Sequence, residues 1–252
     1  MQQAQRLSAI LDRLSSDGNL KVAELAATLR ASTATIRRDL HLLESQRLLS
    51  RTHGGAMPRG VLYELPLRYK GAQHHEEKLR IAREAARRVM DGWAVGLTGG
   101  TTTSEVARAL VDLPRLTVVT NALNIASELV VRPNFKLLVT GGVARSESYE
   151  LVGPVAETSL LEINLEIIFV GVDGITTDAG LTTHHEVEAH TNLAMIDRAR
   201  RVTVVADSSK IGNVAFARIC EIDRVDELIT DNRADASAVA AIEETGVDVT
   251  TV

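Results

Sequence analysis

Short apolar runs of β type alternate with helical stretches from residue 94 onwards, and this alternation limits the fold more than any other feature. The apolar runs cover residues 94–97, 116–120, 136–140, 167–172, 202–206, 227–230 and 247–249. Most are separated by stretches rich in Ala, Leu and Glu, at residues 104–110, 122–131, 154–161, 187–199 and 237–244. Such alternation predicts the α/β class, with a doubly wound, mostly parallel sheet between two layers of helices.

The first 60 residues differ from the rest in charge. They contain nine Lys and Arg against five Asp and Glu, a net charge of +4, whereas the remaining 192 residues contain 19 basic and 28 acidic side chains, a net of −9. A chain of 252 residues is long enough for one small and one large domain. The asymmetry therefore predicts a small basic domain that meets a polyanion, followed by an acidic domain that does not.

Composition excludes several classes of protein. The single Cys220 rules out an internal disulfide bond and a zinc site built from several cysteines. One Trp, three Tyr and three Phe leave little scope for a surface that stacks bases or sugars on aromatic rings. No apolar run reaches the ~18 residues of a membrane span, and the charged N-terminal stretch does not resemble a signal peptide. We therefore expect a cytoplasmic protein with no membrane partner.

Three short helices are expected in the basic segment. The first has apolar side chains at positions i, i+3, i+4 and i+7, namely Leu7, Ile10, Leu11 and Leu14. Ser32 is a suitable N-cap for the third helix, and Ile36, Leu40 and Leu43 give that helix an inward face. Two helices joined by a tight turn, the second with Thr and Arg at its start, are what a helix-turn-helix requires.

The outer face of the third helix is the candidate DNA-reading surface. A recognition helix enters the major groove with its first turns, where guanidinium groups read guanine or bind phosphates. An isolated pair of arginines would more often be a solvated surface feature, but the three-helix pattern and the positive charge favour DNA binding. The expected DNA-binding residues of this helix and its cap are Ser32, Thr33, Ala34, Thr35, Arg37 and Arg38.

Residues 48–56 combine an apolar stretch, a basic stretch and a Gly-Gly turn, which is typical of a β-hairpin wing. Arg51 and His53 are expected on the DNA backbone, and a metal-binding role for His53 is disfavoured. The run ELAATLRASTATIRRDLHLLESQRLLSRTHGGA resembles the N-terminal signature of DeoR-family bacterial transcriptional regulators. In that family the TIRRDL segment is the recognition helix and the R-x-HGGA stretch is the wing.

One position departs from this signature. Arg47 stands where the family usually has Gly, just past the recognition helix. If the backbone there is left-handed, a side chain costs ~1–2 kcal/mol. The same side chain would add a contact to a DNA phosphate.

Residues 57–60 contain Pro and Gly, which interrupt regular secondary structure, and no hydrophobic periodicity continues across them. We expect a winged helix-turn-helix domain over residues 1–57, a linker over 58–74, and an effector-binding and oligomerisation domain over 75–252. One small winged module would bind double-stranded operator DNA weakly, so a homodimer or homotetramer that supplies two half-sites is expected.

Ligands of doubly wound sheets bind beyond the carboxyl ends of the strands. The loop after the first of these strands contains Gly99, Gly100, Thr101, Thr102 and Thr103 and leads into a helix, whose N–H groups suit a phosphate. Later strand ends are followed by Asn121, Gly141, Arg145, Asp173, Gly174, Asp207 and Lys210. Each of these elements alone is usually a turn or a cap, but together they predict a binding site. The loop lacks G-x-G-x-x-G, so a nicotinamide cofactor is disfavoured and no cofactor is expected.

The second part of the chain also resembles the DeoR-family sensor domain, in the segments GTTT, VVTNAL, TGG, GVDGI, GLTT and VADSSK-x-G. That domain is similar in fold to ribose-5-phosphate isomerase, and the resemblance implies a phosphorylated sugar as effector. It implies that Gly100 and the three threonines after it hold the phosphate. The residues that it implies around the sugar are Asn121, Arg145, Asp173, Glu188 and Lys210.

Histidines cluster at one further departure from the family. The family often has Glu-Ala-Glu where this chain has Glu188-Ala189-His190, and His184 and His185 lie nearby. The spacing of the three histidines is not a standard one for metal ligands, so no metal is expected and the histidines face solvent or effector.

Three functions remain open at this point. The first is a repressor of a carbohydrate-metabolism operon, associated with the nucleoid when bound to DNA, whose effector either induces or co-represses. The second is an active sugar-phosphate isomerase with an accessory DNA-binding domain, in which Asp173 and Asp178 would supply carboxylates. It is disfavoured because the isomerases' Lys-Gly-Gly-Gly run is replaced by Gly-Leu-Thr-Thr at 180–183. The third is a scaffold with a vestigial pocket.

Overall fold

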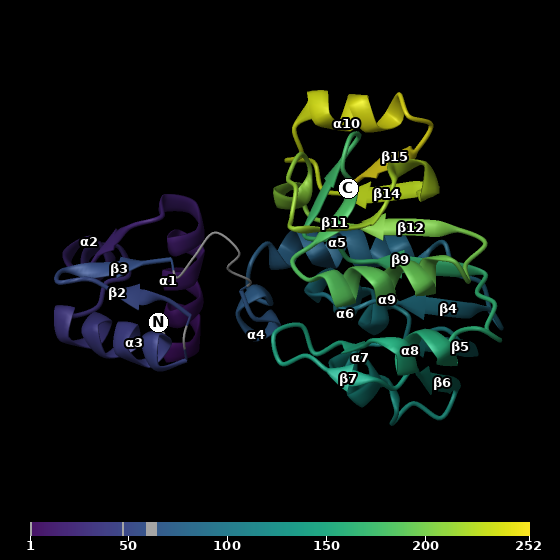
Figure 1. Ribbon diagram of the computed structural model, residues 1–252, viewed down its shortest axis with the longest axis horizontal. Helices are drawn as coiled ribbons and strands as arrows, with labels where there is room; N and C mark the ends of the chain where they lie inside the picture. Colours follow the sequence, from purple (N-terminus) through teal and green to yellow (C-terminus); the bar gives the residue numbers. More distant parts are fainter. Residues whose placement is uncertain (1, 47, 59–64) are drawn as a thin grey trace. The chain divides into compact units, whose positions relative to one another are not determined.

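The computed structural model describes residues 2–46, 48–58 and 65–252, and it divides into two compact units, Met1–Gln73 and His74–Val252 (Figure 1). Within those described ranges, no helix is long and apolar enough to cross a membrane. Arg47, for which a left-handed backbone and a phosphate contact are considered above, lies outside the described residues.

The first unit has the three helices and the wing that the sequence predicts. Its elements are α1 (Gln3–Asp17), β1 (Leu20–Lys21), α2 (Val22–Thr28), α3 (Thr33–Ser45), β2 (Ser50–Arg51), β3 (Gly55–Met57) and α4 (Leu67–Lys70). The strands form one antiparallel sheet in the order β1-β3-β2. Ile10, Leu11, Ile36 and Leu40 are fully buried between the helices, as their spacing predicts. This arrangement is a winged helix-turn-helix.

A buried ion pair joins the first and third helices of this unit. Asp39 is 1% exposed, and Arg6 Nε lies 2.5 Å from its Oδ2. A second nitrogen of the same guanidinium donates to Asp39 Oδ1 at 3.2 Å. A bidentate pair of this kind fixes the orientation of α3 on α1.

The expected linker over residues 58–74 is partly wrong. Residues 59–64 lie outside the described ranges, but α4 packs against α1 within the first unit. Leu65 and Tyr69 join its core, and the Tyr69 hydroxyl donates to Gln46 Oε1 at 2.6 Å. Their apolar side chains explain why this stretch folds onto the domain.

The second unit begins with α5 (His75–Ala86) and then follows the predicted alternation. Its first half contains β4 (Ala94–Leu97), α6 (Thr101–Ala109), β5 (Leu116–Thr120), α7 (Leu123–Leu129), β6 (Phe135–Val139), β7 (Val143–Ala144), β8 (Leu151–Val152) and α8 (Pro154–Ser159). Its second half contains β9 (Ile167–Val170), β10 (Gly174–Thr176), β11 (Gly180–Thr183), α9 (Glu186–Ile196), β12 (Val202–Val205), η1 (Ser208–Lys210), β13 (Ala217–Cys220), η2 (Ile222–Arg224), β14 (Glu227–Thr230), α10 (Ala236–Glu243) and β15 (Asp248–Thr251).

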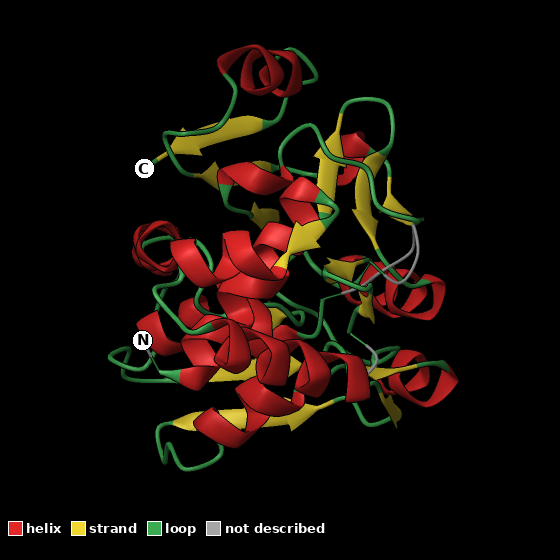
Figure 2. Ribbon diagram, turned by 90° about the vertical axis from the view of Figure 1, so that its left-hand side faces the viewer, coloured by secondary structure: helices red, strands yellow, loops and turns green. Residues whose placement is uncertain are grey.

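Seven strands form one parallel sheet in the order β15-β14-β12-β9-β4-β5-β6. The strand order reverses between β4 and β9, so the connections leave these two neighbours in opposite directions. Such a switch point opens a crevice at the carboxyl ends of the strands. The C-terminal strand β15 packs beside α10 at one edge of the sheet (Figure 2). The α/β class and the mostly parallel sheet are confirmed.

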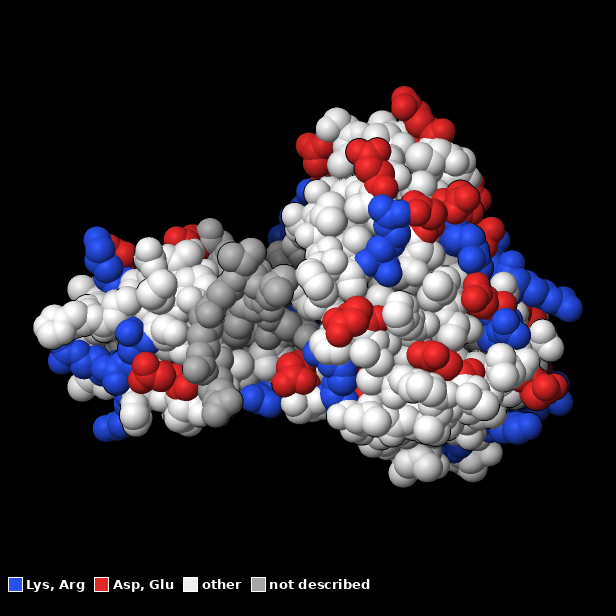
Figure 3. Space-filling view, in the orientation of Figure 1, with Lys and Arg blue, Asp and Glu red and all other residues white. Residues whose placement is uncertain are grey.

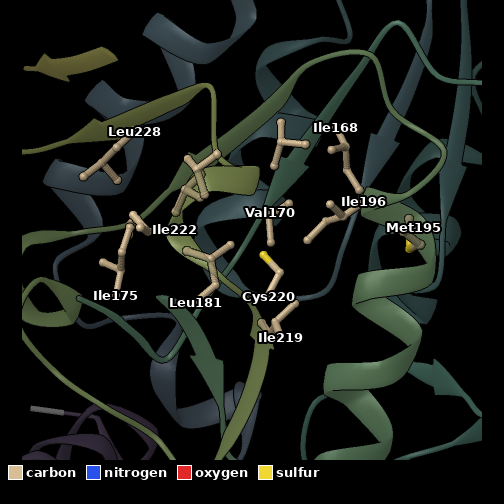
Figure 4. Close-up of a cluster of buried hydrophobic side chains, with 14 of the residues drawn as sticks. Ile168, Val170, Ile175, Leu181, Met195, Ile196, Ile219, Cys220, Ile222 and Leu228 are labelled. Atoms are coloured by element: carbon tan, nitrogen blue, oxygen red, sulfur yellow. The ribbon is translucent and has the colours of Figure 1, made fainter. Parts of the chain in front are cut away.

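Both faces of the sheet are buried, which explains the continuous apolar runs in its strands. On β9, Ile167 and Phe169 belong to the core that includes residues of α5, α6 and α7. Ile168 and Val170 belong to the opposite core, beside α9 (Figure 4). This alternation within four residues is what a strand covered on both faces requires.

A small antiparallel sheet, β10-β11-β13, packs on the second of these cores and is not predicted from the sequence. Gly180 turns the hairpin between β10 and β11 with φ +66°, and a Cβ there would lie 2.1 Å from the Cys220 carbonyl oxygen. Only glycine fits this position, because both the conformation and the space exclude a side chain. The Gly174 and Gly180 segments therefore form strands and are not only loops at strand ends.

An ion network closes the amino edge of the large sheet, which is the side at which its parallel strands begin. Glu227 begins β14 and is 2% exposed. Arg88 Nη2 lies 2.7 Å from Glu227 Oε1, and Arg201 Nη2 lies 3.1 Å from its Oε2. The Thr250 hydroxyl donates to the same carboxylate at 3.2 Å. This buried carboxylate is fully surrounded by donors from the protein itself.

Candidate functional site

The start of α3 presents the residues that the sequence selects for DNA reading. Ser32 Oγ accepts a hydrogen bond from the Thr35 N–H at 3.1 Å, which is the predicted N-cap. Arg37 and Arg38 are exposed, as are Thr33, Ala34 and the cap itself, and Thr35 is half-buried. In Figure 3, Lys and Arg side chains gather over this part of the first unit.

The wing is the hairpin between β2 and β3. Arg51 and His53 are exposed on it, and the Arg51 backbone N–H donates to Glu44 Oε1 of α3 at 3.1 Å. Gly55 lies against β1 so closely that a Cβ would be 1.7 Å from the Leu20 carbonyl oxygen. The second glycine of the RTHGGA stretch is therefore required by packing, and the wing is held by α3 on one side and by β1 on the other.

The switch point brings the loops after β4 and β9 into contact. The Gly171 N–H donates to Thr98 Oγ1 at 3.0 Å, and a Cβ on Gly171 would lie 2.6 Å from the Gly99 carbonyl oxygen. Gly100 has φ +130° and directly precedes α6. The hydroxyls of Thr103 and Ser104 both donate to the Gly100 carbonyl, at 3.0 and 2.7 Å.

Helix α6 therefore begins beside the switch point of the sheet. The first N–H groups of an α-helix have no acceptor within the helix, and they carry a partial positive charge. At this position they belong to residues 101–103, of which Thr102 and Thr103 are buried and Thr101 is half-buried. The arrangement suits an anion, most simply a phosphate.

Asp173 lies just after β9 and is surrounded by three polar side chains. Lys210 Nζ is 3.9 Å from Asp173 Oδ1, and His184 Nε2 is 3.8 Å from the same atom. The Thr183 hydroxyl lies 3.2 Å from Asp173 Oδ2. The predicted residues Asp173 and Lys210, which are far apart in the chain, are thus brought together.

Glu188 of α9 extends this cluster. Arg145 Nη1 lies 2.6 Å from Glu188 Oε1, and the Thr183 hydroxyl lies 3.3 Å from Glu188 Oε2. Thr183 therefore stands between the carboxylates of Glu188 and Asp173. Arg145 is only 13% exposed at its side chain, so its charge is held inside the site.

Glu150 is the acidic residue of this site that the sequence analysis misses. Its carboxylate Oε2 accepts from Asn121 Nδ2 at 3.1 Å, and the same amide donates to Asn192 Oδ1 at 3.2 Å. Burial, and then the nearby Glu188, raise the pKa of Glu150 well above its ordinary value. No motif marks it, since a single Glu before an apolar pair is a common surface pattern.

The remaining predicted residues have structural roles in the same region. Asp207 accepts from the Ser209 N–H at 3.1 Å and so holds the η1 turn that carries Lys210. A Cβ on Gly174 would lie 2.2 Å from the Asn213 carbonyl oxygen, and Gly141 has φ +74°. Asp207, Gly174 and Gly141 thus fix the backbone around the side chains of this site.

The three neighbouring histidines have different surroundings. His184 contacts Asp173, His185 Nδ1 accepts from the Val187 N–H at 3.2 Å, and His190 is exposed on α9. Among the described residues, no group of three His, Cys, Asp or Glu side chains is arranged to hold a metal ion.

Two family profiles match this chain. The DeoR-like helix-turn-helix domain matches residues 6–58, and the DeoR C terminal sensor domain matches residues 73–232. The chain belongs to the DeoR family of transcriptional regulators. Both resemblances drawn from the sequence are therefore confirmed, as is the expected role as a DNA-binding regulator.

Three relatives illustrate the similarity. The chain is 37% identical to the HTH-type transcriptional regulator GlpR of Haloferax volcanii, with 98% of this chain and 96% of the relative covered. It is 34% identical to the glycerol-3-phosphate regulon repressor of Escherichia coli K12, with 92% of each covered. It is 32% identical to the HTH-type transcriptional repressor GlcR of Bacillus subtilis, over 99% of this chain and 96% of the relative. These relatives are regulators and not enzymes, so the isomerase hypothesis is set aside.

Solved structures overlap more loosely. Ribose 5-phosphate isomerase A from Methanocaldococcus jannaschii gives a TM-score of 0.42 at 19% identity, over 55% of each chain. The full-length sorbitol operon regulator SorC from Klebsiella pneumoniae gives 0.38 at 13% identity, over 94% of this chain and 99% of that one.

Proposed function

We propose that this DeoR-family regulator represses a carbohydrate-metabolism operon and responds to a phosphorylated sugar bound at the switch point. The observation that carries the proposal is the proximity of two features. The N-terminus of α6 offers N–H donors to a phosphate. The neighbouring strand ends offer Arg145, Lys210, Asp173 and Asn121 to hydroxyl groups. Asn121 Oδ1 is buried and accepts no hydrogen bond from the described residues, and a sugar hydroxyl would satisfy it.

The relatives support the same proposal. One of them is named a glycerol-3-phosphate regulon repressor, which connects a regulator of this family with a small phosphorylated compound. An effector acts on DNA binding only if it binds the DNA-competent and incompetent states differently, by ~1–3 kcal/mol in ordinary allostery.

On the DNA side, the proposed contacts are the exposed side chains at the start of α3 and on the wing. Arg37 and Arg38 would contact bases or phosphates in the major groove, and Arg51 and His53 would contact the backbone. The other proposed contacts of this surface are Ser32, Thr33, Ala34 and Thr35.

We propose further that the second unit forms the homodimer or homotetramer. Among the described residues, its strand β6 pairs only with β5 and is therefore an edge strand of the large sheet. Beside it, Val139, Val143 and Val155 are 38%, 72% and 65% exposed, and a Cβ on Gly141 would lie 3.6 Å from Val155. The surface over β7 and α8 in Figure 3 is largely uncharged. An exposed apolar patch beside an unpaired edge suits a second copy. Sedimentation should show a smaller assembly for Val143→Glu, and an unchanged assembly would argue against this interface.

The experiment that tests the function is fluorescence anisotropy on the DNA upstream of the protein's own gene. It is repeated with inorganic phosphate, glycerol-3-phosphate, ribose-5-phosphate, glucose-6-phosphate and fructose-6-phosphate. We expect one phosphorylated compound to change DNA affinity at least fivefold, since ~1 kcal/mol corresponds to about that factor. Arg37→Ala should weaken DNA binding by about 1–3 kcal/mol without changing the melting temperature. Absence of any response across the panel, together with unmoved melting temperatures, would contradict the effector proposal.

A further inference from the structure

We propose that Glu150 is a binding residue for the anionic end of the effector and that it is neutral when the effector is bound. Effector binding therefore takes up a proton at any pH at which Glu150 is ionised in the effector-free protein. The inference rests on the proposed function, because it assigns a new residue to the same site.

The first argument is position. The Glu150 side chain fills the space in front of Gly99, where a Cβ would lie 2.1 Å from Glu150 Oε1 and 2.4 Å from its Cγ. Gly99 belongs to the loop that leads into the N-terminus of α6. An anion on that N-terminus would thus meet the carboxyl group of Glu150 at close range. The residue before Glu150, Tyr149, has φ +61°, a left-handed conformation that is unfavourable for a residue with a side chain.

The second argument is charge. Glu150 is 5% exposed, and among the described residues it has no ion pair. The charged groups that face it are Glu188 from α9, Asp173 from the segment after β9, and Arg145 from the segment before β8. Arg145 is engaged at 2.6 Å by Glu188. Two carboxylates, and a cation already paired with one of them, disfavour the ionised form of Glu150.

The consequence follows from electrostatics. A phosphate next to an ionised, buried carboxylate is repelled, whereas a neutral carboxyl group donates its O–H to a phosphate or hydroxyl oxygen. Asn121, which contacts Glu150 Oε2 at 3.1 Å, orients the group. Glutamine at this position would keep the shape and a donor and would not titrate.

The test uses radiolabelled sulfate in equilibrium dialysis, because the charge of sulfate does not change between about pH 5.5 and 8.5 while His and raised carboxyl groups titrate. The wild-type protein is compared with Glu150→Gln, which leaves every other side chain unchanged. We expect the ratio of wild-type to variant affinity to fall as pH rises, by up to about tenfold per pH unit above the pKa of Glu150. Melting curves confirm that the variant is folded.

A ratio that stays constant with pH would overturn the inference and leave the proposed function standing. If neither protein binds sulfate and no sugar phosphate binds, the phosphate cradle is wrong and both proposals fail. With a responsive sugar phosphate, calorimetry in two buffers should show more proton uptake by the wild-type protein than by Glu150→Gln.

An independent set of contacts assigns a second role. We infer that Arg233 is a positioning residue that connects the effector site with the start of the second unit. Asp231 is fully buried after β14, and its Oδ2 accepts from the N–H of Ser208 at 2.6 Å, in the η1 turn that carries Lys210. Its other oxygen accepts from the Arg233 N–H at 3.1 Å.

Arg233 continues this chain of contacts to the first helix of the unit. Its Nη2 donates to His74 Nδ1 at 2.9 Å and lies 2.8 Å from Glu77 Oε1. His74 opens the second unit and has φ +49°, an unusual conformation for a side-chain-bearing residue. A displacement of the η1 turn by a ligand would thus reach His74, the first residue of the second unit, through three polar contacts.

Arg233→Ala should keep the melting shift given by the responsive sugar phosphate and keep effector-free DNA affinity, but should reduce the effect of that compound on DNA affinity at least threefold. Arg233→Lys should restore part of the effect. A full response in Arg233→Ala, or a loss of sugar-phosphate binding, would overturn the assignment. A panel in which no compound binds would already contradict the proposed function.

Discussion

The large parallel sheet carries buried charges both at its amino edge, where the strands begin, and at its carboxyl edge, where they end. The two edges differ in how these charges are paired. At the amino edge, Glu227 is held by Arg88 at 2.7 Å and by Arg201 at 3.1 Å. At the carboxyl edge, Arg145 pairs with Glu188 at 2.6 Å, but Lys210 stands 3.9 Å from Asp173, and Glu150 has no ion pair among the described residues. This difference agrees with the proposed effector site, in which the amino edge is closed by the chain itself and the carboxyl edge offers groups to a ligand.

The strongest test of this comparison removes a cation from the amino edge. Arg88→Ala leaves the buried Glu227 with Arg201 as its one remaining cation among the described residues, and we expect the free energy of unfolding to fall by about 3 kcal/mol, the lower end for a broken buried pair. Urea unfolding measures the loss. Arg87→Ala is the matched control, since its side chain is 75% exposed and should change stability by less than about 0.5 kcal/mol. Equal losses in the two variants would remove the distinction between the edges.

A smaller effect is expected from Glu150→Gln without any ligand. Because the folded-state pKa of Glu150 is raised, the native protein binds more protons than the unfolded chain, so its stability falls as pH rises above 4.5. The variant should be more stable than the wild type at high pH, by about 1.4 kcal/mol per unit of raised pKa. The two should converge at low pH. Melting temperatures across pH measure this, and a difference that does not change with pH would show that folding does not raise the pKa of Glu150.

The smallest stability effect is expected at the carboxyl edge. Lys210→Ala breaks only a 3.9 Å contact of a part-exposed side chain, so stability should change by less than about 0.5 kcal/mol. Effector-free DNA binding should be retained, while the response to sugar phosphate should be lost. Thermal unfolding and anisotropy measure the two outcomes. A variant that fails to bind DNA without effector would show that Lys210 supports the fold.

Sequence patterns predict the features that depend on local periodicity. The cap at Ser32, the inward face of α3 and the order of strands and helices all follow from spacing within one element. The carboxyl edge was also predictable in part, because parallel strands end on the same side and bring Asp173 and Lys210 together.

Features that depend on partners far away in the chain could not be predicted. Asp39 looks like one more surface acid on α3 until Arg6 folds against it. Glu150 has the same ambiguity, since its burial depends on Gly99 leaving room for it. The β10-β11-β13 sheet was missed because its strands mix apolar residues with glycine, threonine and arginine and lack the continuous apolar run that marks the strands of the large sheet.

The crevice draws its groups from separate segments of the chain, at Gly99–Thr103, Asn121, Arg145–Glu150, Asp173–Glu188 and Lys210. A ligand held by all of them acts as a removable cross-link that closes several long loops at once. Its stabilisation would spread through the second unit, as slower amide exchange in β4, β5, β9 and β12, and would not be confined to the atoms that it touches.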